Sequence, residues 1–166
     1  MQNFLYTFNR WRFRNRARGQ PLQFLYDQAP VPARQLFSQT RFLVIDCEMS
    51  GLNAKKNQIV SIGWVQIESD RVVNSSGRQL LVQSDEGGGE GRVIHGLLDT
   101  DLASAKSAAT VLLLLLKQME GCVAVFHHAP IDLQFLQKRR EIQSHPDISR
   151  FVYIIFQKKV WKYLIL

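Results

Sequence analysis

One stretch decides the fold of this chain: Arg41-Phe-Leu-Val-Ile-Asp-Cys-Glu-Met-Ser-Gly-Leu52. It is an apolar strand that ends in two carboxylates, Asp46 and Glu48, with one residue between them. Because side chains alternate across a strand, Asp46 and Glu48 share one face and Cys47 points to the other. The apolar residues before them occupy both faces, which predicts a strand that is buried on both sides.

The two carboxylates need a partner that neutralises them. Like charges at the end of a buried strand repel each other and lose hydration. A divalent cation is the simplest partner, because it prefers oxygen ligands. The pair Asp46 and Glu48 therefore predicts a metal site, although a strand end that meets solvent can carry the same two residues.

Length, composition and charge indicate one globular domain with a basic surface. The 166 residues are 46% hydrophobic and 21% charged, which excludes a disordered chain. The net charge of +7 and the isoelectric point of about 9.7 favour a polyanionic partner such as nucleic acid, although such charge also serves solubility.

The sequence predicts no membrane span, and the cysteines indicate a reducing compartment. The longest unbroken apolar run, residues 111–116, is too short to cross a bilayer. Cys47 and Cys122, the only cysteines, each lie in an apolar run, as buried free thiols do. We therefore expect a cytoplasmic protein.

The chain divides into a basic extension, residues 1–38, and a domain at residues 39–166. The extension has arginines at alternate positions from 10 to 18, several aromatic residues and a proline-marked end. The arginines suit phosphate contacts, but a solvated helix face or a docking arm has the same pattern, and both readings stay open.

Periodicity predicts an α/β domain with a mixed sheet. Three strands form an antiparallel meander at residues 41–47, 58–67 and 71–82. A helix over 108–119 begins after Ser107 as N-cap and stops before Gly121, and a buried strand at 122–126 follows. Pro130 marks the start of a second helix, and Asp132 falls in its first turn, where the helix dipole favours a carboxylate.

Three segments, in order along the chain, resemble the DnaQ-like (DEDD) 3′→5′ exonucleases, within the DEDDh subclass and its epsilon-like members of bacterial DNA polymerase III. Val44–Gly51 resembles the first motif, and Val93–Asp101 is similar to the Ile-His-Gly-Ile-Thr segment. Phe126–Asp132 resembles the second motif, His-Asn-Ala-x-x-Asp. The resemblance covers residues 40–142.

This resemblance implies an RNase H-like fold and two Mg²⁺ or Mn²⁺ ions about 4 Å apart. The implied catalytic metal ligands are Asp46, Glu48 and Asp132. The implied substrate-binding residues are Ser50, Gly51, Leu52, His95, His127 and His128. His128 replaces the family's asparagine. Taken singly, Asp132 is an ordinary helix-terminus residue and the histidines are ordinary loop residues.

The family's third motif, His-x4-Asp or Tyr-x3-Asp, is not found after Asp132. His145-Pro-Asp147 has the wrong spacing and predicts a turn. The tail 151–166 differs in composition and does not resemble the family at that place. We therefore expect a truncated chain with an incomplete C-terminal part and impaired catalysis.

The expected activity is release of nucleoside monophosphates from single-stranded or frayed DNA 3′ ends, as in proofreading. An oligoribonuclease-like RNase is an alternative, because Glu48-Met-Ser-Gly51 resembles the Glu-Met-Thr-Gly of that group. A non-catalytic nucleic-acid-binding remnant is another. No segment indicates a polymerase partner, so that question stays open.

Overall fold

The computed structural model of the protein describes residues 14, 18–19, 23–27, 31–32, 34–83, 104–136 and 163–165. Residues 84–103, which include His95, and most of the basic extension lie outside these residues. The described part before the sheet includes a short helix, α2 (Phe24–Asp27), and a 3-10 turn, η1 (Phe37–Gln39). None of the helices in the described part is of the length and apolarity that crossing a membrane requires.

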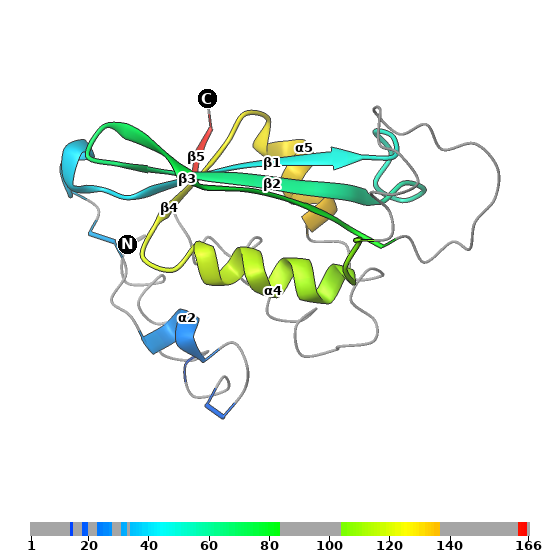
Figure 1. Ribbon diagram of the computed structural model, residues 1–166, viewed down its shortest axis with the longest axis horizontal. Coiled ribbons are helices and arrows are strands. Elements are labelled where there is room, and N and C mark those ends of the chain that lie inside the picture. Colours follow the sequence, from blue (N-terminus) through cyan, green and yellow to red (C-terminus); the bar gives the residue numbers. More distant parts are fainter. Residues whose placement is uncertain are drawn as a thin grey trace, which may run out of the picture.

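A five-stranded mixed sheet forms the centre of the described structure, with strand order β3-β2-β1-β4-β5 (Figure 1). The strands are β1 (Phe42–Met49), β2 (Ile59–Glu68), β3 (Arg71–Leu81), β4 (Val123–Phe126) and β5 (Tyr163–Ile165). β1 to β3 form the predicted antiparallel meander, and β4 pairs parallel with both β1 and β5. The predicted mixed α/β sheet is confirmed, and β5 extends it by a strand that the sequence did not predict.

Two helices pack on one face of this sheet and enclose the core. They are α4 (Ala108–Gln118) and α5 (Ala129–Leu136), and α4 runs along one side of the strands (Figure 1). The large side chains with less than 2% exposure are Phe126, Phe135, Leu43, Ile45, Ile62, Leu115, Leu116, Met119 and Leu136. Burial of these side chains supplies the main free energy that holds the helices on the sheet.

Local signals explain where the elements begin and end. The Oγ of Ser107 accepts a hydrogen bond from the backbone N–H of Thr110 (3.2 Å), which confirms the predicted N-cap of α4. Ser69 and Asp70 connect β2 to β3 with φ angles of 49° and 62°, as a tight hairpin turn requires. Gly121, with φ of 69°, turns the chain from the end of α4 toward β4.

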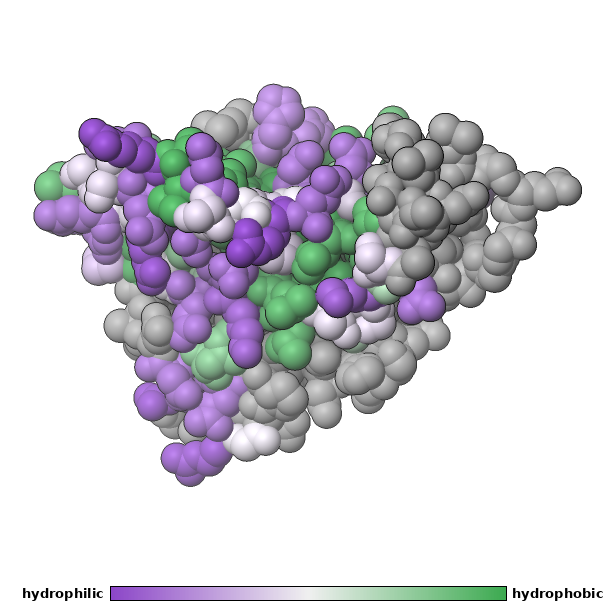
Figure 2. Space-filling model, viewed as in Figure 1, coloured by the Kyte–Doolittle hydropathy of each residue, from purple (hydrophilic) through white to green (hydrophobic). Residues whose placement is uncertain are grey.

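The run of five leucines in α4 supplies more apolar surface than the sheet covers. Leu112, Leu115 and Leu116 are buried, whereas Leu113 and Leu114 are half-buried. Figure 2 shows hydrophobic surface at the position of α4, bordered by hydrophilic residues of the sheet.

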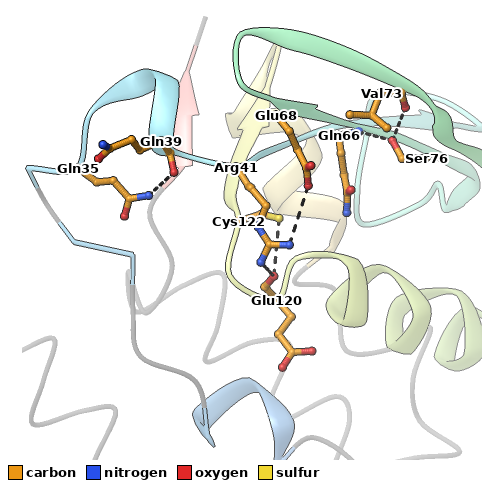
Figure 3. Close-up of polar contacts among 9 residues, drawn as sticks. All are labelled: Gln35, Gln39, Arg41, Gln66, Glu68, Val73, Ser76, Glu120 and Cys122. Carbon is orange, nitrogen blue, oxygen red and sulfur yellow. Dashed lines mark hydrogen bonds and ion pairs between the residues drawn. The ribbon is translucent and has the colours of Figure 1, made fainter.

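The outer strand β3 has an interruption in its pairing with β2 between Val73 and Arg78. At this point the hydroxyl of Ser76 accepts a hydrogen bond from the N–H of Gln66 (2.8 Å) and donates one to the carbonyl of Val73 (2.6 Å) (Figure 3). The side chain of Ser76 thus satisfies backbone groups that a regular ladder would have paired.

Arg41, which precedes β1, contacts the end of β2 and the turn before β4 (Figure 3). Its guanidinium lies 4.0 Å from the carboxylate of Glu68 and donates to the carbonyl of Glu120 (3.4 Å). The Sγ of Cys122 lies 3.7 Å from the same carbonyl. Burial raises the pKa of the Cys122 thiol, which keeps it neutral, as predicted for a buried free cysteine.

Candidate active site

The acidic end of β1 shows the predicted alternation of faces. Cys47 is buried in the core beneath the helices, whereas Asp46 is exposed and Glu48 is half-buried. The expectation that both faces of this strand are buried is wrong at Asp46. The neighbour of Asp46 on β2 is Gly63, which has no side chain to cover the carboxylate.

The second acidic segment reaches β1 where β4 ends. The pairing of β4 with β1 runs from Phe42 with Val123 to Ile45 with Phe126 and then stops. The chain continues through His127 and His128, both exposed, into α5. Asp132 lies in the first turn of this helix, as predicted, and is only 5% exposed.

The carboxylate of Asp132 is held by hydrogen bonds from Cys47. Both the backbone N–H and the thiol of Cys47 donate to it, and the backbone N–H of Asp132 also contributes. Burial raises the pKa of Asp132, the negative charge of Asp46 raises it further, and the hydrogen bonds from Cys47 lower it. The structure therefore brings Asp46 and Asp132 close enough for their charges to repel each other.

The chemistry of these donors fits a hard divalent cation. A positive charge near Asp46 and Asp132 would offset their repulsion and the cost of burying Asp132. Mg²⁺ is often held in proteins by one or two carboxylates together with phosphate oxygens and water. Over the described ranges, no three His, Cys, Asp or Glu side chains gather into a metal-binding group. The assignment of Glu48 as a further ligand therefore stays a prediction.

The loop after β1 is closed by hydrogen bonds between its two ends. The N–H of Ser50 donates to the carbonyl of Gln58 (2.9 Å), and the N–H of Gln58 donates to the Oγ of Ser50 (3.2 Å). Gly51 lies against the side chain of Asn57, where an added Cβ would be 2.8 Å from the Asn57 Cγ. Leu52, at 80% exposure, projects its side chain from the loop into solvent.

Asn53 organises the rest of this loop. Its carbonyl accepts hydrogen bonds from the backbone N–H of Asn57 (2.8 Å) and from the Nδ2 of Asn57 (3.2 Å). Its Oδ1 accepts from the N–H of Lys55 (3.0 Å), as in an Asx turn. Ala54 is buried and anchors the turn. The segment 50–52 is thus presented next to the acidic end of β1 by a defined turn.

The predicted substrate-binding residues fall into three groups. Ser50, Gly51 and Leu52 follow β1 directly, His127 and His128 follow β4, and His95 lies outside the described residues. Sequence reasoning missed Cys47 as the donor to Asp132. The signal available was its face, since alternation directs Cys47 toward the helix that carries Asp132.

Comparison with known proteins identifies the class. The sequence profile of the Exonuclease family (RNase_T) matches residues 43–165, so the chain belongs to this exonuclease family. The match runs beyond the predicted limit at residue 142 and includes most of the tail that we expected to fall outside the family. The tail contains β5, which pairs with β4, so this part of the chain belongs to the same sheet as the rest of the domain.

The most similar relatives include DNA polymerase III PolC-type from Thermotoga petrophila and from Thermotoga maritima. Each is 30% identical over 101 residues, which is 61% of this chain. The chain spans only 7% of the length of these relatives.

Solved structures of exonuclease I share the fold. A product-bound exonuclease I matches with a TM-score of 0.59 and 11% identity, over 77% of this chain and 30% of that chain. The Escherichia coli exonuclease I in complex with a dA16 oligonucleotide matches with a TM-score of 0.58 and 11% identity, over 77% of this chain and 28% of that chain. These likenesses confirm the predicted RNase H-like fold.

Proposed function

We propose that this chain is a metal-dependent 3′→5′ exonuclease domain that releases nucleoside monophosphates from single-stranded or frayed DNA 3′ ends. The observation that carries the proposal is the placement of buried Asp132 beside Cys47, within range of the charge of Asp46. Membership of the exonuclease family supports it, as does the oligonucleotide complex of the similar exonuclease I.

In this proposal Asp46, Glu48 and Asp132 hold Mg²⁺ or Mn²⁺. Bound divalent metal supplies Lewis-acid chemistry at the phosphate and lowers the pKa of water. Asp46 is exposed and so is accessible to a phosphate that arrives from solvent. Asp132 is buried and held by Cys47, which keeps its orientation defined before the nucleic acid binds.

The loop 50–52 positions the terminal nucleotide. The backbone of Ser50 and Gly51 lies next to the acidic end of β1, and exposed Leu52 offers an apolar surface to a base. His127 and His128 follow β4 at the same end of the sheet, and His95, outside the described residues, is a further predicted substrate-binding residue. Because base pairing competes with entry of a single strand, a mispaired or frayed end is the preferred substrate.

The net charge of +7 supports binding of a polyanion, and the basic extension 1–38 is a candidate for non-specific phosphate contacts. Both cysteines are free and buried, which suits a reducing compartment such as the cytoplasm. The similarity to PolC-type polymerases makes proofreading a candidate role, with the polymerase partner open.

The test is digestion of a 5′-labelled single-stranded DNA with Mg²⁺ or Mn²⁺. Asp46→Asn removes the exposed carboxylate of the site, and Asp70→Asn, in the β2–β3 turn, is the matched control, since it also removes one exposed charge. We expect a ladder of 3′-shortened products that Asp46→Asn abolishes and Asp70→Asn preserves. A ladder that persists in Asp46→Asn would contradict the proposal.

A non-catalytic nucleic-acid-binding domain is the second candidate. Two observations favour it: no three-residue metal group forms among the described side chains, and residues 133–166 contain neither third-motif pattern. Binding of labelled DNA that needs no divalent metal and survives Asp46→Asn, without any ladder, would support this candidate. A matched RNA oligomer in the same assay separates the DNA exonuclease from the oligoribonuclease-like alternative.

A further inference from the structure

We propose that Cys47 is a positioning residue for Asp132, which uses two donors to hold the carboxylate in the orientation that cation binding requires. The proposal rests on the proposed metal-dependent function. It adds a role for a residue that touches neither the cation nor the nucleic acid.

The backbone donor of Cys47 is available because β4 ends early. The N–H of Val123 donates to the carbonyl of Arg41 (2.8 Å), so the backbone groups of Arg41 point toward β4. Backbone groups alternate sides along a strand, and those of Cys47 therefore point the same way. The pairing of β4 stops at Ile45 with Phe126, and the carboxylate of Asp132 accepts the hydrogen bond of Cys47 beyond that point.

The side chain of Cys47 adds the second donor. It lies on the face of β1 that α5 covers, and its thiol donates to the carboxylate of Asp132. Cys47 is 7% exposed and Asp132 is 5% exposed, so water competes little with these bonds. A carboxylate has about four acceptor positions. Cys47 occupies two of them and the backbone N–H of Asp132 a third, which leaves the remaining position for a cation shared with Asp46.

Loss of the thiol leaves one of the two donors. In Cys47→Ala the carboxylate keeps the backbone N–H but gains freedom to turn, whereas Cys47→Ser retains a side-chain donor. Removal of hydrogen-bond partners of metal ligands typically lowers metal affinity about 10- to 100-fold. We expect Cys47→Ala to lower Mn²⁺ affinity by such a factor and Cys47→Ser to recover most of the loss.

The first experiment is calorimetric titration of the full chain with Mn²⁺. Cys122→Ala is the matched control, because Cys122 is also buried but its Sγ contacts the carbonyl of Glu120, in the turn before β4. Urea unfolding of each variant establishes that it is folded. Wild-type affinity in folded Cys47→Ala would overturn the positioning role, as would a serine variant as weak as the alanine variant.

A second readout needs no metal. In the Cys122→Ala background, Cys47 is the sole thiol, and its S–H stretching band in the infrared reports its hydrogen bond. Adding Asp132→Asn replaces the charged acceptor with a neutral one of similar size, and we expect the band to move to higher frequency. An unchanged band would overturn the proposal. If Asp132→Asn moves the band but the wild-type chain binds no Mn²⁺ in the titration, the contact between Cys47 and Asp132 is confirmed and the metal-dependent function is overturned.

Discussion

Gly51→Ala tests how the loop beside the acidic strand end is held. The new Cβ would lie 2.8 Å from the Cγ and the Nδ2 of Asn57, which is closer than real Cβ contacts allow. The side chain of Asn57 must therefore move, and its hydrogen bond to the carbonyl of Asn53 (3.2 Å) is lost. A hydrogen bond of this kind contributes about 0.5–1.5 kcal/mol. Gly51 also has a φ of 157°, which L side chains rarely adopt, so we expect Gly51→Ala to cost about 1 kcal/mol for the lost hydrogen bond and backbone strain in addition.

A double-mutant cycle isolates this contact. Asn57→Ala alone loses the same hydrogen bond and also costs about 1 kcal/mol. In the double variant the added methyl group meets no Asn57 side chain, so only the backbone strain at Gly51, whose φ is 157°, adds to the cost of Asn57→Ala. The expected coupling energy is therefore about 1 kcal/mol, which exceeds the roughly 0.3–0.5 kcal/mol within which independent sites add.

Urea unfolding supplies the free energies. In a chain of this size, 1 kcal/mol corresponds to a shift of about 2–4 °C in Tm. Gly63→Ala is the control, because its Cβ would meet only ordinary contacts, the nearest being the Arg78 carbonyl at 3.7 Å. If the costs of Gly51→Ala and Asn57→Ala simply add, Asn57 does not limit the space beside Gly51 and the reasoning is refuted.

Three further predictions concern Asp132 and the helix α4. The raised pKa of Asp132 means that protonation favours the folded state; relative to Asp132→Asn, wild-type stability is highest below pH 3.8 and falls as pH rises through the folded pKa. Urea unfolding at several pH values checks this, and a constant difference contradicts it. Ser107→Ala removes the N-cap of α4 and costs about 1 kcal/mol by urea unfolding, whereas no loss would show that the cap is not used. Leu116→Ala, at a fully buried position, costs about 2–5 kcal/mol in thermal unfolding, and half-buried Leu113→Ala must cost less.

Local patterns were sufficient to predict most of the described fold. The alternation of faces in β1 and the N-cap at Ser107 each depend on neighbours in sequence. β5 depends instead on pairing with β4, about forty residues earlier. A strand of three residues is too short to show a period of two, so its own sequence does not distinguish it.

The candidate site was predictable in its residues but not in its surroundings. The spacing of Asp46 and Glu48, and the place of Asp132 in a helix start, follow from local periodicity. The exposure of Asp46 depends on Gly63 opposite it, which is a matter of strand register. The hydrogen bonds of Cys47 depend on where β4 stops. The position of Gly63 and the end of β4 are both set by segments outside the acidic motif, so the motif alone does not predict them.

The interrupted pairing of β3 bears on how the protein behaves when it is concentrated. β3 is an outer strand of the sheet, and an outer strand with regular unpaired backbone groups is a template for aggregation. Here the ladder breaks between Val73 and Arg78, and exposed Arg71 and Arg78 place positive charge along the same edge. A second copy of the strand would meet like charge and a mismatched register. This edge therefore disfavours the edge-to-edge pairing of strands from which fibrils grow.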